Sequence, residues 1–246
     1  MMKIKSSYKI YWSLILVLAI SASISVYLPQ GDILPMQELP TSKLNLAIIN
    51  FFIMITIYGG LGFIGLKLSK KIGFADIWDK NIALKKKIIQ PLFIGIGLGA
   101  FFIILDLILS NFHSLGALPH PPFPLSLFAS ITAGIGEEII ARLFFISFWV
   151  WLFSHIFFKK KYVKQTFWIV TIFSAILFTV MHIPSIFAVF NLESISDMPR
   201  ILLIELFLLN GTLSIFAAYS FKKYGILTAI GIHFWADVVW HVIYGI

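Results

Sequence analysis

Seven apolar segments recur along this chain, each close to the length of about 20 residues that an α-helix needs to cross a bilayer. Hydrophobic residues make up 59% of the chain, and charged residues only 12%. A soluble domain carries about twice that share of charge. We therefore predict an all-α, polytopic transmembrane bundle that forms a single membrane domain over residues 1–246.

The predicted spans follow the apolar segments. They cover residues 10–28, 44–66, 88–110, 125–159, 167–183, 201–221 and 226–244. The outer loop between the third and fourth spans is rich in proline, which makes it extended and stiff.

Basic residues gather in alternate loops and so predict the orientation. Of the 19 basic residues, sixteen fall on one side: Lys3, Lys5, Lys9, Lys67, Lys70, Lys71, Lys80, Lys85, Lys86, Lys87, Lys159, Lys160, Lys161, Lys164, Lys222 and Lys223. The other side has only Lys43 and Arg200. By the positive-inside rule the N-terminus is cytoplasmic and the C-terminus lies outside.

The net charge of +8 therefore predicts contact with anionic membrane lipid and no nucleic-acid partner. We expect a multi-pass integral protein of a bacterial plasma membrane.

The fourth span contains Glu137, Glu138 and Arg142 inside an apolar run. A charge at bilayer depth costs at least about 2.5 kcal/mol, so three within six residues indicate a function. Glu138 and Arg142 are four residues apart, so they share a helix face and can pair. Glu137 points about 100° away from Glu138 and is the carboxylate left free for chemistry.

Two other spans also carry ionisable side chains. His182 follows Phe178 by four residues in the fifth span, and His233 precedes Asp237 by four in the seventh. Together with the three charged residues of span four they form a set of six that should converge in one intramembrane cavity, because each needs a partner in lipid.

Four more polar residues are weaker candidates. His155 and His241 lie near span ends, where hydrogen-bonded packing or an interfacial position is the commoner role. Asp106 and Glu205 are candidates for a site or a substrate groove.

The depths of the candidates constrain the fourth span. At about 1.5 Å per residue, Glu137 lies about 33 Å from Lys159, whereas His233 lies about 15 Å beyond Lys223. The fourth span must therefore tilt, bend at its glycines or extend past the inner headgroups, and we expect a tilt or an extension.

The three motifs together resemble the CPBP family, which includes the CAAX prenyl endopeptidases and bacterial Abi-type proteins. The resemblance covers residues 125–244 and rests on Glu-Glu-x-x-x-Arg, Phe-x-x-x-His and His-x-x-x-Asp, each in its own span. It implies peptide-bond hydrolysis within the membrane. Asp237 stands where the prenyl endopeptidases have Asn, and no prenyl-binding signature is visible, so the prenylated substrate is not carried over.

A mechanism can be built on these residues. Because the chain has no cysteine, catalysis must use carboxylates, histidines, serines or backbone groups. Glu137 would act as general base on a water held by His182. His233 would donate to the tetrahedral oxyanion, while Asp237 orients it or, if protonated, donates as well.

Two alternatives remain open. In the metal-free scheme Glu138 and Arg142 would hold the catalytic residues in position. In the alternative scheme Glu137, His182 and His233 are enough ligands for a catalytic zinc. We favour metal-free glutamate catalysis, with no cofactor, on a peptide or membrane-protein substrate. The competing class is a non-enzyme, either a proton-coupled transporter or a bacteriocin immunity protein, and immunity could also be the outcome of proteolysis.

Overall fold

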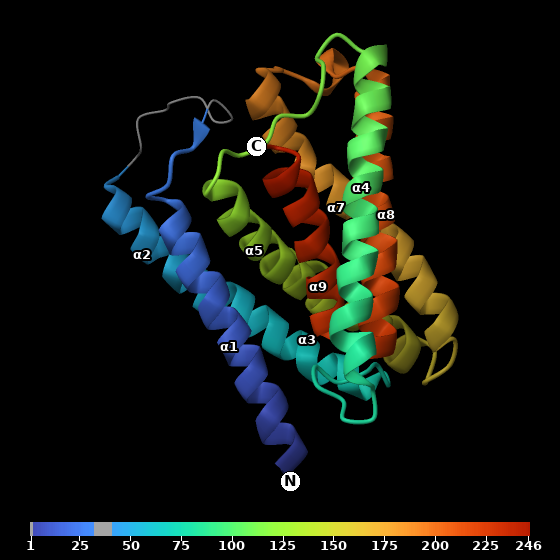
Figure 1. The fold of residues 1–246 in the computed structure, drawn as a ribbon. Coiled ribbons are helices and arrows are strands. Elements are labelled where there is room, and N and C mark those ends of the chain that lie inside the picture. The colour runs from blue at the N-terminus through green and yellow to red at the C-terminus, as the bar shows by residue number, and fades with distance from the viewer. Residues whose placement is uncertain (1, 32–40) are drawn as a thin grey trace.

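The computed structural model describes residues 2–31 and 41–246 and confirms the predicted fold class (Figure 1). Among these residues all regular structure is helical, and seven helices are long and apolar enough to cross a membrane. The elements are α1 (Met2–Ser25), α2 (Lys43–Ile53), α3 (Gly59–Lys71), α4 (Gln90–Leu109), α5 (Leu125–Glu138), α6 (Ser147–Trp151), α7 (Val163–Phe190), α8 (Arg200–Tyr224) and α9 (Ile226–Asp237).

Short segments of wider, π-helical geometry join or extend several of these helices. They are Met54–Tyr58 between α2 and α3, Lys85–Ile89 before α4, Ile139–Ile146 and Leu152–Phe157 on either side of α6, and Val238–Ile243 after α9. Ser110–Phe112 and Ile195–Asp197 form short 3₁₀ turns.

Several span boundaries differ from the prediction, among them the ends of α1 and α7. Helix α1 ends at Ser25 rather than at residue 28. Helix α7 continues through Pro184 to Phe190, although we had ended this span at residue 183. Proline removes one backbone donor, whereas leaving the helix in lipid would expose several unpaired backbone groups, so the helix continues.

The fourth span is one unbroken helix over Leu125–Phe157, 33 residues long. At about 1.5 Å per residue it measures roughly 50 Å, well beyond a hydrocarbon core of about 30 Å. Figure 1 shows α5 running obliquely to α4 and α8, in line with the expected tilt. The chain keeps α-helical geometry through Gly134 and Gly136 and widens only from Ile139 onwards.

Glycines allow the helices to touch through their backbones. A Cβ added to Gly65 on α3 would collide with the carbonyl of Leu143, and one on Gly95 of α4 would collide with the carbonyl of Ile232 on α9. Both glycines therefore serve helix contact, whereas a Cβ on Gly60 would meet nothing within 4 Å.

Gly65→Ala should consequently destabilise the bundle by about 1–3 kcal/mol, the usual cost of forcing extra atoms into a packed core. Gly60→Ala is the matched control on the same helix and should leave the thermal midpoint of the detergent-solubilised protein unchanged. Equal midpoints for the two variants would contradict the assigned α3 contact.

Candidate active site

The buried ion pair Glu138–Arg142 lies at the end of α5. Arg142 Nε is 3.2 Å from Glu138 Oε2, and both side chains are fully buried, so the predicted pairing is confirmed. Helical geometry changes from α to π directly after Glu138. Such widened turns occur frequently at functional sites.

Arg142 also ties the fourth span to two other helices. Its Nη2 donates a hydrogen bond of 2.9 Å to Ser214 Oγ on α8. Its guanidinium carbon lies 4.3 Å from the centre of the Phe178 ring on α7, a cation–π contact. Sequence reasoning missed Ser214, because an isolated serine in an apolar helix carries no signal of its own.

His233 on α9 is oriented by Glu138. Its Nδ1 lies 2.9 Å from Glu138 Oε1, a charge-assisted hydrogen bond in which the ring N–H donates. Asp237, which we had expected to orient this ring, lies 3.5 Å from the other nitrogen, Nε2, at the limit of a hydrogen bond. The shorter contact to the ring therefore comes from Glu138, while Asp237 faces the opposite nitrogen.

His182 is held by its own helix. The carbonyl of Phe178 can only accept, so His182 Nδ1 must carry the proton in their 2.7 Å hydrogen bond. In the neutral ring Nε2 is then unprotonated, and it lies 3.9 Å from Glu137 Oε2. The site therefore contains a histidine nitrogen that can accept a hydrogen bond beside the free carboxylate.

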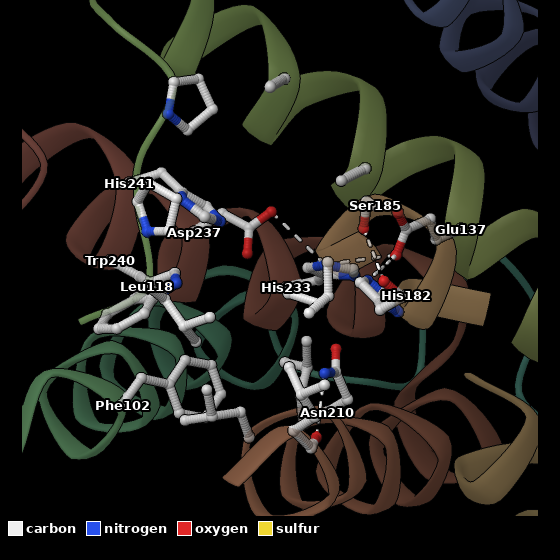
Figure 2. Close-up of a pocket in the computed structure, with 18 residues that line it drawn as sticks. Phe102, Leu118, Glu137, His182, Ser185, Asn210, His233, Asp237, Trp240 and His241 are labelled. Carbon is white, nitrogen blue, oxygen red and sulfur yellow. Dashed lines mark hydrogen bonds and ion pairs between the residues drawn. The ribbon is translucent and has the colours of Figure 1, made fainter. Parts of the chain in front are cut away.

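Glu137 and His182 are the more exposed members of the site, whereas His233 is buried. The side chain of Glu137 is 37% exposed, and its Oε2 lies 3.9 Å from both His182 Nε2 and His233 Nε2. Within the described residues this oxygen has no hydrogen-bond partner. Figure 2 shows the three side chains pointing toward one another, with Asp237 one turn further along.

A cavity of about 220 Å³ is lined by Glu137, His182, His233 and Asp237. The predicted convergence of these four residues in one cavity is thereby confirmed. Their roles in catalysis remain a proposal.

A family model described as type II CAAX prenyl endopeptidase, Rce1-like, matches residues 119–239 of the chain. The chain belongs to the CPBP family. The match contains all six residues of the predicted set, and membership makes the protein, in general terms, a CAAX-type intramembrane protease and a multi-pass membrane protein. No curated protein and no solved structure matches the chain.

The geometry of a zinc site can be compared with this CPBP centre. Bonds of 2.0–2.1 Å at tetrahedral angles place two ligand atoms roughly 3.3 Å apart. Glu137 Oε2 lies 3.9 Å from each histidine nitrogen. Within residues 2–31 and 41–246 no three His, Asp or Glu side chains are arranged to hold a metal ion. To bind zinc, these side chains would have to move closer together.

A histidine pair lies at the far end of the cavity, and only one of its members, His241, was singled out from the sequence. His241 lines the cavity and its Nδ1 is 3.1 Å from Nδ1 of His120, a residue of the loop before α5. Burial lowers the pKa of His120, with the charge of Asp106 acting in the opposite direction. The pair fastens this loop to the C-terminal helix.

Asp106 and Glu205 lie outside the cavity. Asp106 Oδ1 accepts a 3.0 Å hydrogen bond from the backbone N–H of Leu118, and Glu205 Oε2 lies 3.5 Å from His113 Nε2. The two carboxylates therefore anchor the loop between α4 and α5. His155, at the opposite end of the bundle, contacts Ser154 and takes no part in the site.

Proposed function

We propose that this chain is an intramembrane endopeptidase of a bacterial plasma membrane that hydrolyses membrane-associated or small hydrophobic peptides through a glutamate-activated water, without a metal. One observation carries the proposal. The Glu137 carboxylate, whose Oε2 accepts no hydrogen bond from the described residues, lies at equal distance from two histidine nitrogens inside a cavity at membrane depth.

Glu137 is the general base in this scheme. A water hydrogen-bonded to Glu137 and to His182 Nε2 loses its proton to Glu137 as its oxygen attacks the scissile carbonyl carbon. The protonated Glu137 then returns the proton to the leaving nitrogen as the C–N bond breaks. The gap of 3.9 Å between Glu137 Oε2 and His182 Nε2 allows one water to bond to both groups.

His233 stabilises the oxyanion. Its Nδ1 lies 2.9 Å from Glu138, and its Nε2 lies 3.5 Å from Asp237 and 3.9 Å from Glu137. An imidazolium, which carries a proton on both nitrogens, satisfies these carboxylates best. Its Nε2–H is then directed into the cavity and can donate to the developing negative charge. Asp237, at the same nitrogen, adds a second donor when it is protonated.

The test is cleavage by the purified protein in detergent. The substrates would be quenched fluorescent peptides of apolar sequence, with and without a prenylated cysteine. The Glu137→Gln protein, purified in the same way, would give the background rate. We expect cleavage above this background. A transporter or a purely binding immunity protein would cleave none of the peptides, and such a result would remove the proposed activity.

Activity should survive a strong chelator. Glu138 already pairs with Arg142 and accepts a hydrogen bond from His233, so if Glu137 ligated a metal neither glutamate would remain free as base. We expect the same initial rate before and after treatment with EDTA and dialysis. Loss of activity on chelation with recovery on added zinc would overturn the metal-free scheme and leave the protease assignment standing.

A further inference from the structure

The catalytic cavity extends from the reactive residues toward one end of the bundle only. On α5 its other lining residues, Ala129 and Ala133, precede Glu137. The lining residues on α7 follow His182 in the chain. On the last span the lining residues Asp237, Trp240 and His241 follow His233. The loop residues Leu118, Pro119 and Pro121 complete the wall. Each step leads toward the end of the bundle where the loop before α5 and the C-terminus lie (Figure 1).

The other direction is closed by packed side chains. After Glu137 in the chain, the fourth span continues through Ile139, Leu143 and Ile146, each at most 1% exposed. These residues belong to one apolar core with Ala217 and Phe221 of α8. The fully buried Arg142 lies in the same layer. A further hollow that adjoins Glu137 and His182 reaches only about one turn in this direction, to Ile140, Ala141 and Phe178, and stops short of this layer.

A second hollow supports the same direction. It adjoins Glu137 and lies between α1 and α5, lined by Leu18, Ala22 and Ser25 of α1 and by residues 125–136 of the fourth span. These segments also lead from the level of Glu137 to the end of the bundle at which α1 ends and α5 begins.

The lysines mark the closed end. Lys70 and Lys71 end α3, Lys85–Lys87 precede α4, and Lys159–Lys161 follow the fourth span at that end. Lys222 and Lys223 lie there too, in the last turn of α8. Basic loops stay in the cytoplasm, because translocating them is unfavourable. The closed end is therefore cytoplasmic, and the open end faces away from the cytoplasm.

We propose that the active site opens to the extracytoplasmic side, so that its substrates are segments of exported or membrane-anchored proteins that reach the site from outside. That the entering segments are substrates rests on the proposed function, whereas the position of the opening does not depend on it. It places the cleaved bond in the outer half of the bilayer, out of reach of a peptide tail that ends in the cytoplasm.

The absence of cysteine from the chain allows a clean accessibility test. Asn210→Cys puts a thiol on the cavity wall, Ser114→Cys puts one on the exposed loop before α5, and Lys161→Cys puts one on the opposite end. Each single-cysteine protein would be treated with a membrane-impermeant sulfonated maleimide in right-side-out and in inside-out vesicles.

We expect the thiols at positions 114 and 210 to react in right-side-out vesicles, and the thiol at 161 only in inside-out vesicles. Reaction at 210 only in inside-out vesicles overturns the proposal, as does reaction at 210 in neither preparation. The proposal is also overturned if the thiol at 114 reacts only in inside-out vesicles and the thiol at 161 reacts in right-side-out vesicles, because the whole bundle would then be inverted.

A catalytic arm separates this inference from the proposed function. An impermeant peptide that the detergent-solubilised protein cleaves should be cleaved by right-side-out vesicles, while inside-out vesicles should show only the background of Glu137→Gln. Cleavage by inside-out vesicles alone would refute the outward opening and keep the protease. If the solubilised protein cleaves no peptide, the proposed function fails, and maleimide labelling still decides where the cavity opens.

Discussion

Glu137→Gln should lower the rate of peptide cleavage by about 100- to 10,000-fold, because it removes the proposed general base. The amide keeps the size of the side chain, and Glu137 is partly exposed to the cavity, with an Oε2 that accepts no hydrogen bond from any described residue. The fold should therefore not depend on its charge. Kcat is the quantity to measure, at saturating peptide, on protein purified in the same detergent.

Glu193→Gln is the matched control for this substitution. Glu193 follows α7, away from the cavity, and its replacement makes the same chemical change. It should keep the full rate, and both variants should unfold at the wild-type temperature. A Glu137→Gln protein with wild-type kcat would show that another group is the base.

The elements of the fold and the reactive set were predictable for related reasons. Lipid offers backbone groups no hydrogen-bond partners, so the length of each apolar run fixed the helices. The same scarcity made Glu137, His182 and His233 conspicuous, because ionisable groups at this depth need each other. The i to i+4 spacing gave the Glu138–Arg142 pair directly.

Contacts between distant segments could not be predicted in the same way. The bond from Glu138 to His233 joins residues 95 positions apart, and the sequence offered Asp237 as the nearer partner on the same helix. Ser214 and His120 likewise acquire their roles only through tertiary packing. The continuation of α7 beyond Pro184 was missed because the local rule for proline does not include the cost of exposing backbone to lipid.

Arg142→Met should destabilise the protein by about 3–5 kcal/mol, the usual cost of leaving one member of a buried ion pair without its partner. Arg142 is fully buried and connects three spans, through Glu138 on its own helix, Phe178 on α7 and Ser214 on α8. The expected result is a lower thermal midpoint in detergent together with a lower yield of folded protein.

A second substitution should recover much of this loss. In the double variant Glu138→Gln/Arg142→Met neither member of the pair is left as an unpaired buried charge, and replacing a buried ion pair by neutral groups of similar volume is often close to neutral. The side-chain carbonyl of the amide introduced at position 138 can still accept from His233 Nδ1–H, so the ring stays oriented. We expect the thermal midpoint of the double variant to lie above that of Arg142→Met, with catalysis still impaired because His233 has lost a neighbouring negative charge. If the double variant is no more stable than the single one, the ion pair does not account for the role of Arg142, and its contacts with Phe178 and Ser214 carry the stability instead.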